Sequence, residues 1–243
     1  MTWVKICGIT NLEDARVSID AGAHALGFVF YDKSSRYVCP RLAREIASKL
    51  PDDVEKVGVF VDMAEDRAMD IFSQVKLTAM QWHTLSGECS IRQLEAVGSC
   101  WLRPKIYYCL PVAGLLEEPE KWKRAIAHFD GLGDGILGGK GEGAPRGGLG
   151  RTVFVDSGTA EQPGGTGKPF DWRRAQPLVA AMKKRLRVVV AGGLHASNVS
   201  EAIAILKPYG VDVSSGVESR PGKKDREKLR AFLGAVRQAE KMG

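Results

Sequence analysis

Two residues with reactive side chains stand where short apolar segments of the chain end. Cys7 closes Trp3–Cys7 just before Gly8, and Asp156 closes the run VFVD before a Ser-Gly pair. A thiol abstracts protons only as its thiolate, and a carboxyl group donates one near neutral pH only when burial raises its pKa. Each residue also has a plainer role, because free cysteines fill apolar space and aspartates cap turns. The two residues alone leave both interpretations open.

Small residues follow two later apolar segments. Gly192 and Gly193 follow VVVA, and Ser214, Ser215 and Gly216 follow VDV. Small residues let backbone N–H groups approach an anion closely, and the start of a following helix adds unpaired donors. Either group alone could be a tight turn. Together they predict a phosphate site.

A glycine-containing loop lies between these two groups of residues. The stretch 163–172, PGGTGKPFDW, contains Gly165 and Gly167 and lacks the first glycine and the Ser or Thr that a P-loop needs. Its composition suits a loop that closes over a ligand, and it suits a plain surface loop equally well. A helix is expected to start near Asp171.

Apolar and amphipathic segments alternate almost from end to end of the 243 residues. Segments such as VGVFV are apolar on both faces, as in strands buried in a parallel sheet, and the stretches 11–23 and 39–50 have helical periodicity. Eight such pairs predict one α/β domain over residues 1–243, a parallel (β/α)8 TIM barrel, with an open doubly wound sheet as the alternative. The predicted strands begin near Trp3, Ala25, Lys56, Leu77, Trp101, Thr152, Arg187 and Val211.

One interval between predicted strands is longer than the others. It contains residues 131–150, of which ten are glycine, so this segment cannot bury much surface or hold a helix. We expect an insertion between the fifth helix and the sixth strand, flexible at least in part. The run GDGILG within it matches a dinucleotide fingerprint, but the strand and helix that this motif requires do not flank it.

Composition narrows the class of protein. Five cysteines without a C-x-x-C pair and four scattered histidines argue against disulfides and a metal site and favour the cytoplasm. No segment predicts a membrane span or a secretion signal. The formal charge of +6 could attract nucleic acid, but the basic clusters lack interleaved aromatic residues and any nucleic-acid motif, whereas an anionic small substrate stays open.

Several of these segments together resemble one enzyme family. KICGIT, GFVF with SSRYV, VGVFVD, FVDSGT, GGTGKPFDW, AGGL and VDVSSGVES occur in the order found in phosphoribosylanthranilate isomerases of tryptophan biosynthesis, over roughly residues 3–233. The resemblance implies a (β/α)8 barrel that converts N-(5-phosphoribosyl)anthranilate to the 1-deoxyribulose 5-phosphate isomer, an Amadori rearrangement without a cofactor. A monomer or a homodimer is compatible with it.

The resemblance also implies roles for individual residues. Cys7 matches the general base, Asp156 the general acid and Arg36 the group that faces the anthranilate carboxylate. The phosphate would be held after the sixth to eighth strands, by the residues Gly165, Gly167, Gly192, Gly193, Ser214, Ser215 and Gly216. A useful thiol base needs a lowered pKa, which nearby positive charge such as that of Arg36 could supply.

Two segments depart from the family pattern. QWHT at residues 81–84 replaces the usual QLHG, so Trp82 suggests a bulkier fourth loop, and His83 is expected to line the pocket. The fifth unit, from Trp101, is the least family-like. These departures keep open a different aminoaldose 5-phosphate as substrate. A phosphate-ligand binder without catalysis is the other alternative, against which the presence of Cys7 and Asp156 argues.

Overall fold

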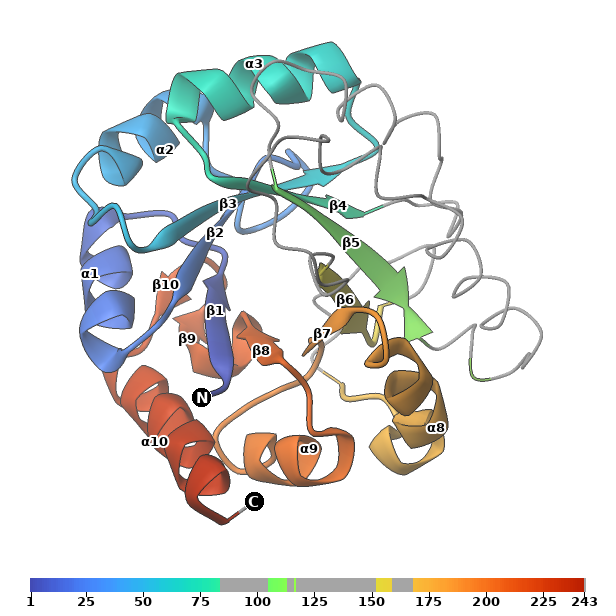
Figure 1. The fold of residues 1–243 in the computed structure, drawn as a ribbon. Helices are drawn as coiled ribbons and strands as arrows, with labels where there is room; N and C mark the ends of the chain where they lie inside the picture. The colour runs from blue at the N-terminus through green and yellow to red at the C-terminus, as the bar shows by residue number, and fades with distance from the viewer. Residues whose placement is uncertain (84–104, 113–115, 117–151, 159–167, 243) are drawn as a thin grey trace, which may run out of the picture.

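The barrel consists of eight parallel strands in a closed ring. The computed structural model describes residues 1–83, 105–112, 116, 152–158 and 168–242 (Figure 1). Each strand pairs in parallel with the next and the last pairs with the first, which confirms the predicted barrel and excludes the open sheet. The strands are β1 (Trp3–Cys7), β2 (Ala25–Val29), β3 (Glu55–Val61), β4 (Ala79–His83), β5 (Lys105–Pro111), β6 (Thr152–Asp156), β7 (Arg187–Val190) and β8 (Gly210–Val213).

Seven of the eight predicted strand starts agree with the structure to within two residues. The fifth was predicted at Trp101, which lies outside the described residues, and the described part of that strand begins at Lys105. The glycine-rich segment 131–150 and the two loop glycines Gly165 and Gly167 also lie outside them.

Helices cover the outside of the ring (Figure 1). Asn11 caps the first helix by accepting a hydrogen bond from the Asp14 N–H, and Asp171 caps a later one through the Arg174 N–H, as predicted. Among the described helices, none has the length and apolar composition that a membrane crossing needs. The described helices are α1 (Leu12–Ala21), α2 (Pro40–Ala47), α3 (Glu65–Val75), α8 (Trp172–Met182), α9 (Val199–Leu206) and α10 (Arg226–Met242).

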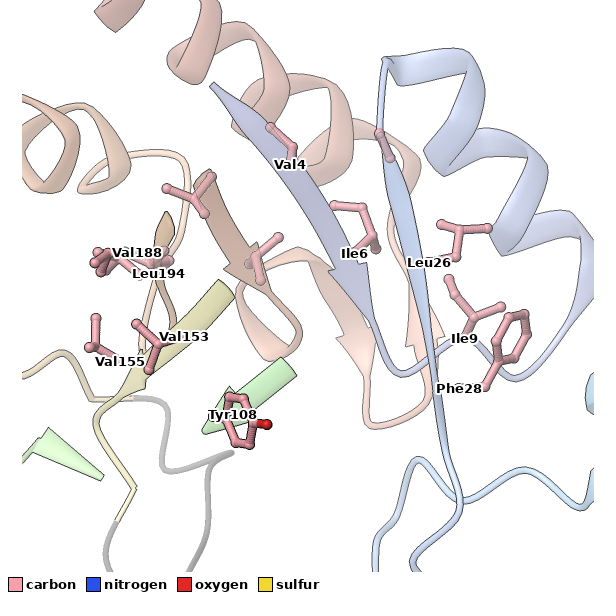
Figure 2. Packing of buried hydrophobic residues seen from close by; sticks show 14 of the residues in the cluster. Val4, Ile6, Ile9, Leu26, Phe28, Tyr108, Val153, Val155, Val188 and Leu194 are labelled. Carbon is pink, nitrogen blue, oxygen red and sulfur yellow. The ribbon is translucent and has the colours of Figure 1, made fainter. Parts of the chain in front are cut away.

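Side chains along each strand alternate between the helix layer and the barrel interior. On β1, Val4 and Ile6 join the apolar layer under the helices, which Figure 2 shows beside Leu26 and Phe28 of β2. The alternate β1 positions, among them Lys5, face inward. Apolar residues on both faces thus bury the strands, and only the inward positions can serve a site.

The interior is closed by aromatic rings at the amino-terminal ends of the strands. The Trp3 ring lies edge-on to Tyr107 and to Phe154, with both pairs of ring centroids 6.2 Å apart. Tyr107 Oη donates to Glu55 Oε2 at 2.5 Å. This set of side chains, Trp3, Tyr107 and Phe154, is called the aromatic floor below.

After β8 the chain crosses to the carboxyl end of β1. A short 3-10 turn, η1 (Ser215–Val217), leads into the small antiparallel pair β9 (Glu218–Arg220) and β10 (Lys223–Lys224). The Thr10 hydroxyl donates to the Gly222 carbonyl, which ties this pair to the loop after β1. The pair therefore brings its polar side chains to the carboxyl end of β1.

Candidate active site

Cys7 ends β1 at a sharply defined turn. Gly8 has a φ of +80°, and the N–H groups of Gly8 and Ile9 both donate to the Gly27 carbonyl, at 3.0 and 2.9 Å. A Cβ added at Gly27 would lie only 2.8 Å from Cys7 Sγ, so the neighbouring strand needs glycine beside the thiol. Cys7 keeps part of its surface exposed. Its side chain therefore lies at the carboxyl end of β1, beside Gly27 of the neighbouring strand.

The backbone carbonyl of Cys7 is bound by two side chains from the end of the chain. Lys224 Nζ donates to it at 2.6 Å and Ser214 Oγ at 3.1 Å. The Lys224 ammonium is itself buried and forms an ion pair with Glu218 at 2.9 Å. The residues after β8 thus fix the position of the thiol.

Burial dominates the titration of Cys7. Desolvation raises the pKa of the thiol above its usual value, and the positive charges of Lys5 and Lys224 oppose this shift without cancelling it. This net direction is opposite to the one expected for a resting base, and the opposing charge comes chiefly from Lys5. An efficient base at this position depends on further stabilisation of the thiolate.

Asp156 ends β6 and is nearly buried. Burial raises its pKa from the ordinary 3.8 to about 6, although the Gly158 N–H, which donates to Oδ1 at 2.6 Å, works against the shift. The hydrogen bond to Gly158 is the turn cap that the sequence offered as a plainer role. The carboxyl group therefore caps the turn and also titrates near neutrality.

Arg36, in the loop after β2, makes a two-point ion pair. Its Nε and Nη2 atoms donate to the two Glu218 carboxylate oxygens at 2.9 and 2.8 Å. The hydrogen bonds to Glu218 raise the pKa of the guanidinium. A Cβ at Gly8 would lie 2.6 Å from Arg36 Cδ, so this side chain crosses directly over the turn after Cys7. One edge of the guanidinium is occupied by Glu218.

The small residues after β7 and β8 are required by close approach. Gly192 and Gly193 have φ values of +83° and +64°, and a Cβ at either would lie 2.2 Å from an atom of Ser157 or Pro169, respectively. A Cβ at Gly216 would lie 1.9 Å from the Leu194 carbonyl oxygen. The loops after β6, β7 and β8 thus meet with no room for larger side chains.

The serines after β8 differ in what they do. The Ser214 hydroxyl donates to the Cys7 carbonyl, so this side chain supports the thiol strand. Ser215 opens the 3-10 turn η1 beside it. Of the residues predicted to hold phosphate, Ser214 therefore has a second and structural task.

The two residues singled out on β4 face opposite ways. His83 lies inside, with its Nε2 3.0 Å from Gln81 Nε2, and burial together with the Lys5 charge lowers its pKa to about 4. It is neutral at physiological pH. Trp82 faces outward and packs on Phe60, with ring centroids 5.5 Å apart. The expectation that Trp82 makes the fourth loop bulkier is wrong, because alternation along the strand turns its ring toward the helices.

Comparison with known proteins gives a consistent result. The family model of N-(5'-phosphoribosyl)anthranilate (PRA) isomerase matches residues 4–108 and 149–235, a match interrupted over most of the glycine-rich segment. N-(5'-phosphoribosyl)anthranilate isomerase of Geobacter sp. (strain M21) is 40% identical over 234 residues, 96% of this chain and 97% of that protein. The enzyme of the same name from Thermotoga maritima is 38% identical with the same coverage. The chain belongs to the phosphoribosylanthranilate isomerase family.

A solved phosphoribosylanthranilate isomerase structure shares the fold. It superposes with a TM-score of 0.75 at 34% identity, covering 98% of this chain and 100% of the other. That protein is in complex with reduced 1-(o-carboxyphenylamino)-1-deoxyribulose 5-phosphate. The TIM barrel implied by the resemblance is thus confirmed both within this chain and by a solved member of the family.

Four charged residues near the carboxyl ends of the strands were not singled out from the sequence. They are Lys5, Asp212, Glu218 and Lys224. Lys5 and Asp212 did carry a signal, because a charge in the middle of an apolar strand, as in WVKIC and GVDV, has to find a partner. Glu218 and Lys224 stand in polar segments, where a charge is unremarkable.

Proposed function

We propose that this chain isomerises N-(5-phosphoribosyl)anthranilate to 1-(2-carboxyphenylamino)-1-deoxyribulose 5-phosphate in tryptophan biosynthesis, with Cys7 as general base and Asp156 as general acid. The observation that carries these roles is the Asp156 carboxyl group, whose burial brings its pKa to about 6 at the mouth that also holds Cys7. Only β7 and β8 separate their strands in the ring. An acid and a base can therefore act on one ligand from different sides.

The environment of Asp156 determines how much acid is available. With a pKa of about 6, about one carboxyl group in ten is protonated at pH 7, against fewer than about one in a thousand at the ordinary value of 3.8. Burial thus increases the proton-donating form by about two orders of magnitude. This increase suits a group that must donate a proton near neutral pH.

The proposed reaction moves two protons and breaks one ring bond. The protonated Asp156 donates to the ribose ring oxygen, the C1–O bond breaks and the nitrogen lone pair completes a Schiff base. The positive nitrogen acidifies the C2–H bond, and the Cys7 thiolate removes that proton. The resulting enolamine tautomerises to the ketone. Substrate and product have the same composition, so no oxidant or reductant enters.

Two groups would bind the anionic ends of the substrate. We assign the phosphate to the loops after β6, β7 and β8, with backbone donors around Gly192, Gly193, Ser215 and Gly216, joined by the loop of Gly165 and Gly167. Arg36 would receive the anthranilate carboxylate. Because Glu218 occupies its Nε–Nη2 edge, the carboxylate would bind at the outer edge, which includes Nη1.

Other parts of the proposal concern the setting of the enzyme. We propose one domain over the whole chain and a cytoplasmic location, supported by the absence of C-x-x-C pairs among five cysteines. The outward orientation of Trp82 removes one of the two reasons for a different aminoaldose phosphate. The assigned substrate is therefore the one to test first.

The decisive experiment is turnover of freshly generated phosphoribosylanthranilate, followed by the loss of its fluorescence. We expect rapid loss with the unchanged protein and collapse in Cys7→Ala and Asp156→Ala. Cys39→Ala is the matched control, because Cys39 lies just before α2 and its removal should leave the rate unchanged. A folded protein that binds sugar phosphates without turnover would replace this function with ligand binding or another aminoaldose.

A further inference from the structure

A buried ion pair lies inside the barrel below Cys7. Lys5 is fully buried, and its Nζ donates to both carboxylate oxygens of Asp212, at 3.0 and 2.9 Å. The two residues lie on β1 and β8, the strands that close the ring (Figure 1). Burying a charged pair costs free energy that apolar residues of similar volume would not cost. The proton transfers proposed above give neither residue a role, so the pair has no explanation yet.

Lys5 and Cys7 occupy the same small region of the interior. They stand two positions apart on β1, so their side chains point to the same face of the strand. A Cβ built on Gly27 would lie 2.8 Å from Cys7 Sγ and 3.0 Å from Lys5 Cε. The two side chains therefore pass over the same glycine. A larger residue there would separate the ammonium from the sulfur or displace both.

The charge of Lys5 reaches several titrating side chains inside the barrel. Burial by itself lowers the pKa of the Lys5 ammonium, but the Asp212 carboxylate and Cys7 outweigh it, so the pKa is raised and Lys5 stays protonated. Besides Asp212, its charge counts among the influences on the pKa values of four neighbouring groups, those of Cys7, His83, Cys109 and Asp156.

We propose that Lys5 is a positioning residue that stabilises the thiolate of Cys7 for proton abstraction, and that Asp212 fixes the lysine ammonium in place. This inference rests on the proposed role of Cys7 as base. When the thiol ionises, its proton leaves to solvent, and the negative sulfur is stabilised by the fixed ammonium. The sulfur lone pair then accepts the C2 proton of the substrate, which restores the thiol.

Two other cations stand near Cys7, and their contacts give them a different task. Lys224 Nζ is shared between the Cys7 carbonyl, the Ser214 carbonyl and Glu218. Arg36 is paired with both oxygens of Glu218. These contacts hold backbone and carboxylate, whereas Lys5 interacts with the Cys7 side chain itself. Lys5 is also the larger opposing influence on the thiol pKa.

The inference is tested by the pH dependence of Cys7 alkylation in the absence of substrate. Iodoacetamide reacts with the thiolate, and mass spectrometry of the peptide that carries Cys7 separates it from the other four cysteines. We expect Lys5→Met to move the midpoint of alkylation by more than one pH unit toward alkaline pH. Lys5→Arg, which keeps the charge, should restore most of the shift. An unchanged midpoint in Lys5→Met would overturn the proposal.

Two further variants separate charge from damage to the fold. Lys56→Met removes another buried barrel lysine, whose Nζ donates to the Pro51 carbonyl, and should leave the midpoint unchanged. Because Lys5→Met leaves Asp212 buried and unpaired, it could unfold the protein. The double variant Lys5→Met/Asp212→Asn removes both charges and should still shift the midpoint toward alkaline pH, since the influence of Lys5 on the thiol exceeds that of Asp212. A shift equal to that of Lys56→Met would contradict the inference.

Turnover and alkylation, measured together, distinguish this inference from the proposed function. Full turnover in Cys7→Ala would remove Cys7 as the base, whatever Lys5 does to its titration. Lost turnover in Cys7→Ala with an unshifted alkylation profile in Lys5→Met would leave the isomerase mechanism intact and remove only the role of Lys5.

Discussion

At the amino-terminal ends of the strands the barrel interior is aromatic, and at their carboxyl ends it is polar and titratable. The rings of the aromatic floor contact one another edge-on, and the Tyr107 hydroxyl is paired with Glu55. Two positions further along the same strands stand Lys5 and Asp156. Along each of these strands, the first inward residue thus packs in the aromatic floor and the next inward residue carries a titratable group.

The difference between the two ends teaches how the site acquires its chemistry. Phe154 and Asp156 are successive inward residues of β6, and the Lys5 Nζ lies 5.3 Å from the centre of the Phe154 ring. The floor excludes water from below, so charges above it are poorly solvated and their pKa values shift. The unreactive end of the barrel therefore contributes to the reactive one.

The largest expected effect comes from removing the acid. Asp156→Asn keeps the side-chain shape, and we expect kcat/KM to fall by roughly two to four orders of magnitude, the range of general acid catalysis. Stability should change in the opposite direction. The folded-state pKa of about 6 exceeds the unfolded value near 3.8, so the contribution of Asp156 to the free energy of unfolding is most favourable below pH 4 and is lost as pH rises from 4 through 6. The variant should avoid this loss.

The stability gain can be measured by denaturant unfolding. At pH 7 we expect Asp156→Asn to be more stable than the unchanged protein by up to about 3 kcal/mol, the equivalent of the pKa shift, and at pH 4 the two should be equal. Equal stability at both pH values would mean that the Asp156 carboxyl is well solvated, which would remove the contrast between the two ends of the barrel.

The next effect comes from opening the floor. Phe154 is fully buried, and Phe154→Ala should cost roughly 3–5 kcal/mol of unfolding free energy through the cavity that it leaves. Water admitted from below should also lower the pKa of Asp156 toward 3.8. The matched control is Phe28→Ala, equally buried in the outer layer, which should cost similar stability and leave that pKa unchanged. Titration of the Asp156 carboxyl by carbon NMR measures its pKa in both variants. Denaturant unfolding measures their stability.

The smallest effect is the pH profile of the unchanged enzyme. With an acid of pKa about 6 and a base whose pKa is raised, the productive form has Asp156 protonated and Cys7 ionised. We expect kcat/KM to increase tenfold per pH unit up to about pH 6 and then to stay level until the thiol titrates. Initial rates between pH 4.5 and 8 test this expectation. A profile still rising steeply between pH 6 and 8 would speak against Asp156 as the acid.

The alternation of apolar and amphipathic segments predicted the fold, and the residues at the carboxyl ends of the predicted strands indicated the candidate site. Cys7 and Asp156 could be placed because both close an apolar segment, and parallel barrel strands bring all their carboxyl ends to one mouth. The sequence could not show that Trp82 faces outward. Its strand is buried on both faces and has no alternation of apolar and polar residues that would distinguish them.

The contacts that tune the site could not be predicted from the sequence. Lys5 pairs with Asp212 across 207 positions of the chain, and Arg36 pairs with Glu218 across 182. Such pairings depend on barrel closure and on the path after β8. A single sequence holds no information on which of several distant charges a given residue meets. The sequence-based account therefore placed Cys7 and Asp156 at the strand ends and left out the charges that influence their pKa values.

The hydrogen bonds from Lys224 and Ser214 to the Cys7 carbonyl have a consequence for how the site forms during folding. Cys7 lies on β1, while the side chains that bind its carbonyl stand 217 and 207 positions away in the chain. Contacts of such large sequence separation form late in folding. Partly folded chains therefore carry the thiol without these contacts, which form when the ring closes.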